Sequence, residues 1–274
     1  YKGEPDSLVQ EVKVVDPATF QFVLKQPFAA FPNAIASSFF GIASPAAIQK
    51  AGASYGTPAG GAVGTGAFLF KEWRSGDRVV LTKNPNYWKA GFPKANQLVM
   101  RFVGDSGARL AQVRAGQIDF TVELAPDQKG EIARDPNLQE VSRPSFNVGY
   151  LALNPSYKPL SDVRVRQAIA HAINKSAIVK AFWQGSAVTS PHFLPPALDW
   201  ANSPTLKDYE YSPQKAKELL KQAGFPNGFD LDLWYMPIAR GYYPTPKPIA
   251  EAFAADLKAV GIRANLKTKD WAAY

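Results

Sequence analysis

Apolar and polar residues alternate near the start of the chain, which is the period of a β-strand with one covered face. Two such runs between residues 8 and 25 flank Asp16-Pro17-Ala18, residue types that favour a tight turn. The alternating apolar residues are Val12, Val14, Phe20, Phe22 and Leu24. The pattern therefore predicts a β-hairpin over residues 8–25.

Residues 26–63 are rich in Pro and Gly, which interrupt regular structure. Prolines divide PFAAFPNAIASSFF, residues 27–40, so one long helix is not expected there. The stretch GASYGTPAGGAVGTG, residues 52–66, is typical of a linker or a flexible crossing between domains. It lacks the Lys and Ser/Thr of a phosphate loop and is not a strand-to-helix Gly-x-Gly-x-x-Gly, so a phosphate site is not favoured.

Strand and helix patterns alternate between residues 64 and 146, as in α/β structure. Two strands are predicted around a turn at Ser75-Gly76, and another strand begins near residue 97. A helix follows over residues 106–115, with Ser106 as its N-cap and Gly116 as its stop. Beyond it the pattern predicts a strand, a short helix and a strand, over residues 118–122, 125–134 and 138–142.

The stretch 147–185 joins an apolar strand to a long amphipathic helix. Apolar residues stand on both faces of the predicted strand, which is typical of a strand covered on two sides. These are Val148, Tyr150 and Ala152 on one face and Leu151 and Leu153 on the other. Ser161-Asp162 is a good N-cap pair, and a helix is predicted from Asp162 to Phe182, ending by Gly185. Its apolar series is Val165, Ile169, Ala172, Ile173 and Phe182.

Two later helices have clear start and stop signals. Ser212 as N-cap and Pro213 in the first turn begin one helix, which Gly224 ends. The other is expected over residues 248–260, with Gly261 as its stop.

Composition excludes several classes of protein. The 274 residues include no Cys, so disulfides, thiolate metal sites and cysteine nucleophiles are excluded. No run approaches the roughly 18 apolar residues that span a bilayer. The net charge of +8 could suggest nucleic acid, but Lys and Arg are spread singly along the chain, which favours a solvated surface. We expect no nucleic-acid partner.

The residues that could carry catalysis or bind a metal form no known constellation. His171 lies within the predicted long helix and His192 in a Pro-rich loop, without metal-ligand spacing. Two pairs of carboxylates are close in sequence and could suggest acid–base catalysis of the glycosidase type: Glu123 with Asp127, and Asp230 with Asp232. The latter two alternate with leucines and would face solvent on one side of a strand. No hydrolase or metalloprotease motif occurs, so we expect a protein that is not an enzyme and holds no cofactor or metal.

The best candidate for ligand contact is the stretch 234–244, which leaves a predicted strand, turns at Pro237 and surrounds one arginine with aromatic residues. The planar guanidinium of Arg240 suits bidentate binding of a carboxylate, whereas Trp and Tyr line pockets without demanding one side chain. Trp271 could be a wall of the site or part of a core. The candidate ligand-binding residues are Trp234, Tyr235, Met236, Arg240, Tyr242 and Trp271.

Four collinear segments carry a family resemblance. They are GTGAFLFKEWRSGDRVVLTKNPNYW (64–88), QLVMRFVGDSGARLAQVRAGQIDF (97–120), NVGYLALNPSYKPLSDVRVRQAIAHAINKSAIVKAFWQG (147–185) and YSPQKAKELLKQAGFPNGFDLDLWYM (211–236). In this order they resemble the solute-binding proteins of dipeptide and oligopeptide ABC importers, extracellular solute-binding protein family 5. The resemblance covers most of the chain from about residue 10 onward.

This resemblance implies an α/β fold of the periplasmic-binding-protein type, type II and three-domain cluster C, with two lobes around a cleft. Family members are roughly twice as long, so we expect an internal fragment truncated at both ends. Residues 1–63 would be a remnant of the second, small domain and residues 64–146 part of the first domain. Residues 147–274 would be a third domain, incomplete at its C-terminal end.

The resemblance also implies a function: an exported, monomeric protein of the periplasm or cell envelope that captures a peptide and delivers it to ABC permease subunits. In dipeptide-binding relatives the Arg of a Met-Pro-x-x-Arg-Pro stretch clamps the peptide carboxylate, which corresponds to Arg240 here. Gly241 stands where those relatives have Pro. Their Asp that holds the amino group has no match in these residues.

Relatives that carry nickel complexes, haem, glutathione or sugars leave the cargo open. A structural envelope component that has lost transport is a further alternative, as is an enzyme.

Overall fold

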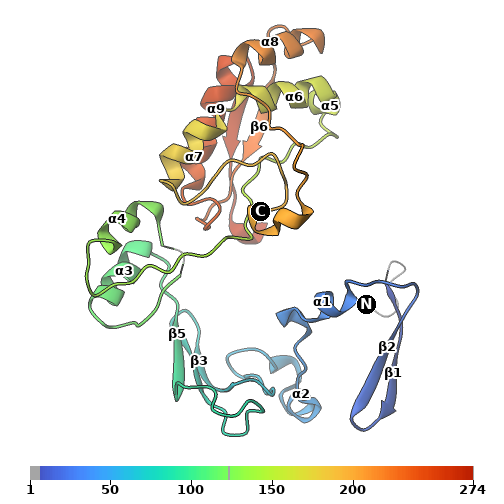
Figure 1. The fold of residues 1–274 in the computed structure, drawn as a ribbon, viewed down its shortest axis with the longest axis vertical. Coiled ribbons are helices and arrows are strands. Elements are labelled where there is room, and N and C mark those ends of the chain that lie inside the picture. The colour runs from blue at the N-terminus through green and yellow to red at the C-terminus, as the bar shows by residue number, and fades with distance from the viewer. Residues whose placement is uncertain (1–6, 123, 274) are drawn as a thin grey trace. The chain divides into compact units, whose positions relative to one another are not determined.

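The computed structural model describes residues 7–122 and 124–273. The chain divides into two compact units, one up to Val103 and one from Gly104 onward. Figure 1 shows the elements of each unit along the chain. Each unit is described by itself.

The first unit begins with the predicted hairpin. Strands β1 (Val9–Asp16) and β2 (Thr19–Leu24) pair antiparallel, and the Asp16 carboxylate accepts a hydrogen bond from the Ala18 N–H at 2.8 Å in the turn. The prediction of a hairpin is confirmed. Short helices follow, in keeping with the prolines and glycines of residues 26–63. They are α1 (Phe31–Ile35), η1 (Ser38–Phe40), α2 (Pro45–Ala51) and η2 (Gly52–Ser54).

A three-stranded antiparallel sheet completes the first unit. Its order is β3 (Phe68–Arg74), β4 (Arg78–Lys83) and β5 (Gln97–Arg101). Gly76 adopts φ 73° in the turn between β3 and β4, a conformation that glycine tolerates without steric cost. Asn84, 8% exposed, donates from its amide to the Gly66 carbonyl and so ties the chain before β3 to the end of β4.

The second unit begins with helix α3 (Ser106–Arg114). Its N-cap is Asp105 rather than the predicted Ser106, because the Asp105 carboxylate accepts from the Ala108 N–H at 2.7 Å. Gly116 ends the helix at φ 65°, as predicted.

The predicted helix over 125–134 is a short 3₁₀ turn, η3 (Pro126–Gln128), followed by α4 (Lys129–Ile132). The strands predicted over 118–122 and 138–142 do not occur in the described chain, where neither stretch has a hydrogen-bonded neighbouring strand.

The strand predicted over 147–153 is also wrong, since these residues run without a hydrogen-bonded ladder. Leu151 and Leu153 pack against the core, but Tyr150 on the other face is 56% exposed. One face rather than two is therefore covered. An extended segment with apolar residues on both sides forms a buried strand only when a neighbouring strand pairs with it. Among the described residues no strand pairs with this segment.

The helix predicted from Asp162 to Phe182 is interrupted. It consists of α6 (Val163–Ala172) and α7 (Lys175–Trp183), preceded by the single turn α5 (Lys158–Ser161). At the break the Asn174 side chain accepts from the Ala177 N–H at 3.0 Å, and the Asn174 N–H donates to Asp256 at 2.8 Å. A new N-cap and a carboxylate distant in sequence thus satisfy the backbone groups that a continuous helix would have paired.

The later elements agree with the predictions. Helix α8 (Pro213–Gln222) begins at the cap Ser212, and α9 (Pro246–Ala259) precedes Gly261 at φ 96°. A 3₁₀ helix, η4 (Pro196–Ala201), lies in the loop before them.

Strands β6 (Asp230–Trp234) and β7 (Arg263–Lys267) pair in parallel. A Cβ added at Gly228 would lie 1.8 Å from the Gly261 carbonyl oxygen, so the loops that precede the two strands can touch only because Gly228 has no side chain.

The main core belongs to the second unit. Helix α6 packs against α8 and α9, and α9 packs on both strands of the parallel pair (Figure 1). The largest fully buried side chains are Val165, Leu220, Ile249, Leu257 and Ile262. Among the described residues, no helix is long and apolar enough to cross a membrane.

Candidate ligand-binding site

The parallel pair places two loops at one edge of the sheet. Trp234 and Lys267, the last residues of β6 and β7, are register partners, so the chain leaves both strands at the same place. Ligands of open α/β sheets bind beyond the carboxyl ends of the strands, where such loops converge. Here the loops are residues 235–245 and residues 268–273, the latter ending in the 3₁₀ turn η5 (Trp271–Ala273).

The loop after β6 is fixed by backbone hydrogen bonds. The Tyr235 N–H donates to the Lys267 carbonyl at 2.9 Å, which extends the pairing beyond the strand. Arg240 and Tyr243 exchange two backbone bonds, of 2.9 and 2.8 Å, and close a tight turn. The Tyr243 hydroxyl donates to the Tyr150 carbonyl at 3.2 Å, and the loop therefore contacts the extended segment 147–154.

Gly149 permits this close approach, because a Cβ there would lie 2.9 Å from the Tyr242 carbonyl oxygen. Gly149 thus indicates a close backbone contact, which the apolar residues of this segment do not predict.

Two cations lie over tryptophan rings at this edge. The Arg240 guanidinium carbon is 5.0 Å from the centre of the Trp271 ring, and the Lys269 ammonium nitrogen is 5.3 Å from the centre of the Trp234 ring. Both distances are within the range of cation–π attraction. The two tryptophans are half exposed, at 47% for Trp234 and 49% for Trp271. The structure thus brings Arg240 and Trp271, 31 positions apart in the printed sequence, into contact.

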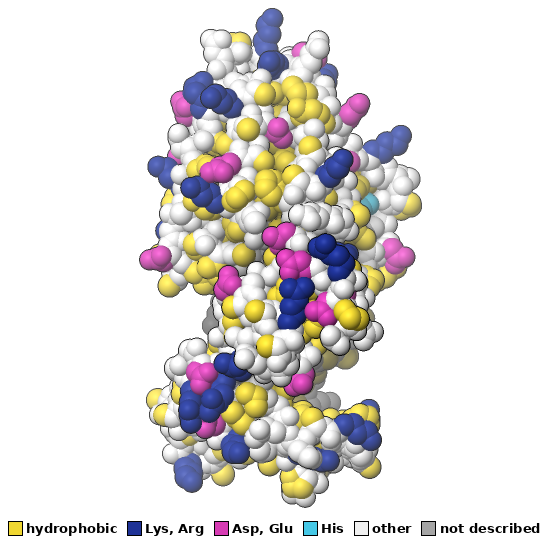
Figure 2. Space-filling view, turned by 90° about the vertical axis from the view of Figure 1, so that its left-hand side faces the viewer, with side chains coloured by type: hydrophobic (Ala, Val, Ile, Leu, Met, Phe, Trp, Pro, Cys, Tyr) yellow, Lys and Arg dark blue, Asp and Glu magenta, His cyan; other side chains and the backbone are white. Residues whose placement is uncertain are grey.

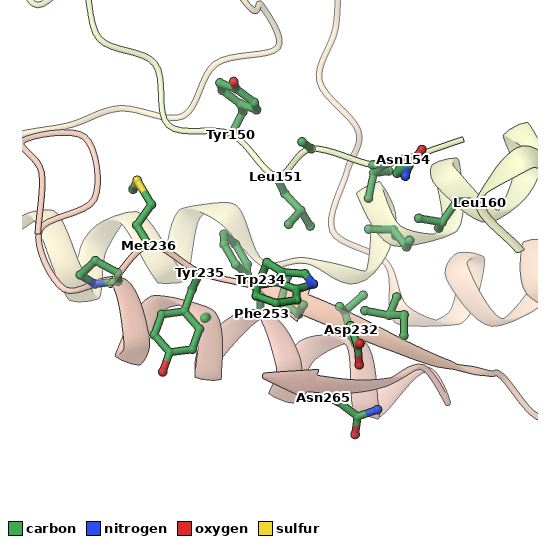
Figure 3. Close-up of a pocket in the computed structure, with 18 of the residues that line it drawn as sticks. Tyr150, Leu151, Asn154, Leu160, Asp232, Trp234, Tyr235, Met236, Phe253 and Asn265 are labelled. Carbon is green, nitrogen blue, oxygen red and sulfur yellow. The ribbon is translucent and has the colours of Figure 1, made fainter. Parts of the chain in front are cut away.

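A pocket of about 840 Å³ lies between the extended segment 147–154 and β6 (Figure 3). Tyr150 and Leu151 line it from the segment, whereas Trp234, Tyr235 and Met236 line it from the sheet edge. Four of the six predicted site residues are in its lining: Trp234, Tyr235, Met236 and Tyr242. Arg240 and Trp271 do not line the pocket. Arg240 is joined by backbone hydrogen bonds to Tyr243, which does line it, and the loop that holds Trp271 contacts the lining residue Trp234 through Lys269.

The chemistry of the pocket is that of a binding site. Helix α9 contributes Ala250, Phe253 and Leu257, so the floor is apolar, and the polar groups are few. Asn154, Asp230, Asp232, Asn265 and the tyrosine hydroxyls supply them. An apolar cavity of this size with a few polar groups is typical of small-molecule sites.

The carboxylates do not form an acid–base pair. Arg263 donates to Asp230, with 2.7 Å between Nε and Oδ1, and this hydrogen bond holds the pKa of the Asp230 carboxyl below its ordinary value. Asp232 is exposed, as predicted for the solvent side of β6. Asp127 lies in η3 and Glu123 lies outside the described residues.

The histidines are engaged elsewhere. The Nδ1 atom of His171 is 2.7 Å from the Glu210 carbonyl oxygen, and its ring meets Tyr209 edge to face. His192 lies in the loop before η4, where its N–H donates to the Ser190 hydroxyl. In residues 7–122 and 124–273 no group of three or more His, Asp or Glu residues could hold a metal ion.

Lys269 is the residue that the sequence did not single out. It follows Lys267 by two positions in the stretch KTKDW, and only the parallel pairing of β6 and β7 places it against Trp234. A signal could have been found in the alternation of residues 263–267, because a charge just beyond a strand end is expected at the ligand edge of an α/β sheet.

This fold and site define a solute-binding protein of the α/β class. Residues 2–274 match the family described as bacterial extracellular solute-binding proteins, family 5 Middle, and the chain belongs to that family. The predicted family and the predicted fold are both confirmed.

Two curated relatives illustrate the range of the family. The chain is 37% identical over 278 aligned residues to the dipeptide-binding protein of Escherichia coli, covering 99% of this chain and 51% of the relative. It is 34% identical over 272 aligned residues to a di/tripeptide-binding protein of Pseudomonas aeruginosa, covering 98% and 50%. The chain thus spans about half the length of the curated relatives it matches.

Solved structures share the fold. A periplasmic binding protein, DppA, from Helicobacter pylori in complex with the peptide STSA has a TM-score of 0.82 at 30% identity, covering 97% of this chain and 51% of the other. A dipeptide-binding protein from Pseudoalteromonas in complex with Met-Leu has a TM-score of 0.85 at 28% identity, covering 98% and 53%. The fold is therefore that of periplasmic binding proteins.

Proposed function

We propose that the protein captures dipeptides or short oligopeptides for an ABC importer and catalyses no reaction. The observation that carries this proposal is Arg240, which is held over Trp271 at the carboxyl edge of the parallel strands. The cation–π contact leaves the N–H donors of the guanidinium free to bind a carboxylate in bidentate geometry. Relatives named as dipeptide-binding and di/tripeptide-binding proteins support peptides as the ligand.

The pocket supports a ligand of variable side chain. Trp234, Tyr235, Met236 and Tyr242 offer contact area without a fixed hydrogen-bonding demand, and Met in particular adapts to different shapes. We infer that charge pairing fixes the peptide end at Arg240, while the aromatic wall and water accommodate the side chains.

Calorimetry on the whole protein with dialanine tests the role of Arg240. Arg240→Ala should weaken binding by roughly tenfold or more, because a charge-assisted pair contributes on the order of 2 kcal/mol. Arg143→Ala, at an exposed position outside the pocket lining, is the matched control and should bind as the original protein does. Equal affinity of the Arg240 variant and the control would remove Arg240 from the site.

A second cargo has specific support. The chain is 34% identical to a heme-binding protein A of Haemophilus influenzae and to a glutathione-binding protein of Salmonella. Mass spectrometry of whatever copurifies with the whole protein distinguishes peptide, haem and glutathione, and absence of any solute would favour a structural envelope role.

The family supports a proposal for the location and partners. We propose an exported, monomeric protein of the periplasm or cell envelope that docks on membrane permease subunits. Figure 2 shows one face on which Lys and Arg side chains are interspersed with Asp and Glu. Mixed surface charge of this kind does not favour nucleic acid as a partner despite the net charge of +8.

We also propose how the chain corresponds to a three-domain binding protein. Residues 1–63 are assigned to the small second domain, residues 64–146 to the first, and residues 147–274 to the third. The main core, within residues 160–262, supports a coherent third domain.

A further inference from the structure

Lys269 is a second cation at the proposed peptide site. It lies in the loop after β7, and its ammonium group is 5.3 Å from the centre of the Trp234 ring. Trp234 lines the pocket, and Lys269 itself is exposed, so its ammonium group is accessible to a ligand. A lysine over an indole is held in position while its three donors stay available.

The second cation is close in the chain to the tryptophan that contacts the first. Lys269 precedes Trp271 by two positions, a separation of at most about 7 Å between Cα atoms. The Arg240 guanidinium carbon lies over the ring of Trp271, 5.0 Å from its centre. Each cation is therefore supported by a tryptophan, and each tryptophan comes from the loop or strand end opposite its cation.

The charges around Lys269 leave it available. The nearest carboxylates by position are Asp232, on the same face of β6 as Trp234, and Asp270, the next residue in the chain. Of the salt bridges formed by the described residues, none includes Lys269 or Arg240. Two cations that form no salt bridge with the described residues favour a ligand that carries two negative groups.

We propose that Lys269 determines specificity by binding the acidic side chain of a peptide whose last residue is Asp or Glu. This inference rests on the proposed function, in which Arg240 binds the terminal carboxylate. The two carboxylates of such a residue are joined through one Cα, so one can engage Arg240 while the other reaches Lys269. An ammonium group is a compact charge without a fixed fork geometry and so accepts side chains of either length.

Calorimetry with two matched dipeptides tests the proposal on the whole protein. Alanyl-glutamate and alanyl-glutamine differ only in the charge of the last side chain. The original protein should bind alanyl-glutamate roughly fivefold more tightly, the effect of one partly exposed charge pair. Lys269→Gln should abolish this preference, so that the ratio of the two affinities falls to about one, whereas Lys269→Arg should retain it.

Two further variants separate this inference from the proposed function. Lys258→Gln removes an exposed lysine at the end of α9 and should leave both affinities unchanged. Arg240→Gln should weaken both dipeptides alike. A thermal melt of each variant confirms that it is folded.

The outcomes are distinct. Equal binding of the two dipeptides by the original protein, or a preference that persists in Lys269→Gln, overturns the inference and leaves the proposed function standing. Failure of the folded original protein to bind either dipeptide contradicts the proposed function and removes the inference with it.

Discussion

Residues 147–273 and residues 7–103 differ sharply in how they bury apolar side chains. In the first region Val165, Ile249 and Ile262 are 0% exposed and belong to one core. In the second, Val80 is the one buried residue among the described Ala, Val, Ile, Leu, Met, Phe, Trp and Tyr residues, while Val14 is 83% exposed and Phe20 is 54% exposed. The two regions therefore differ in packing, one around a shared core and the other with most of its apolar side chains accessible.

This difference in burial shows which elements form from local sequence signals and which need distant packing partners. The hairpin and the three-stranded sheet of residues 7–103 are defined by alternation and by turns at Asp16-Pro17-Ala18 and Ser75-Gly76, which act over a few residues. The parallel pair β6–β7 cannot form locally, since its strands are joined by α9 and gain stability only when that helix packs on them. The proposed ligand edge therefore depends on the packed region.

A core truncation should show the contrast most strongly. Leu257→Ala, at a position 1% exposed, should lower the free energy of unfolding by about 2–5 kcal/mol, because it leaves a cavity beneath the parallel pair. Val14→Ala in the exposed hairpin should change it by less than about 0.5 kcal/mol. Urea unfolding of both variants measures the difference, and similar costs would show that the hairpin is packed as tightly as the core.

Removal of a helix N-cap should also cost more stability in the packed region than in residues 7–103, with smaller effects than the core truncation. Asn174→Ala removes the N-cap of α7 at the break after α6 and should cost about 1 kcal/mol. Ser44→Ala removes the equivalent cap of α2, a helix with no buried residue, and should cost only a fraction of that, since α2 can fray without disturbing a core. Equal losses in urea unfolding would contradict this account.

His171 tests whether a loop attached to the packed region depends on a single hydrogen bond. His171→Gln weakens the bond to the Glu210 carbonyl and should cost at most about 1 kcal/mol, seen as a lower Tm. Affinity for dipeptide should remain within about twofold, because His171 does not line the pocket. Loss of binding by a folded variant would give His171 a role in the site.

The smallest expected effect concerns pH. Hydrogen bonds from the Arg164 side chain hold the pKa of Asp162 below its ordinary 3.8. The resulting stabilisation is complete above that ordinary value and is lost as the pH falls through the lower pKa of the folded protein.

Asp162→Asn should therefore reduce the acid dependence of amide protection in α6, measured by hydrogen exchange below about pH 4. In the hairpin the pKa of Asp16 is lowered mainly by the Ala18 N–H, and Asp16→Asn should leave protection in α6 unchanged. An effect of the Asp16 variant on α6 would show that the two regions unfold together.

The sequence by itself determined the elements whose signals are local. The hairpin over 8–25, the turn at Ser75-Gly76, helix α8 from its cap Ser212, and the stop of α9 at Gly261 were all predicted, because caps, glycines and alternation act within a few residues. The apolar series through Val165 and Ile169 likewise identified core residues correctly. Family and fold were available from the collinear motifs.

Tertiary structure decided what depends on distant partners. The long helix is interrupted at Asn174, whose N–H donates to Asp256, and the extended segment 147–153 has no described strand as a ladder partner. The contacts Arg240–Trp271 and Lys269–Trp234 exist because β6 and β7 run parallel and end at one edge. Residue types could suggest Arg240 as a ligand for carboxylates, but the register of two strands separated by a helix placed Lys269 against Trp234, and no periodicity along the chain encodes that register.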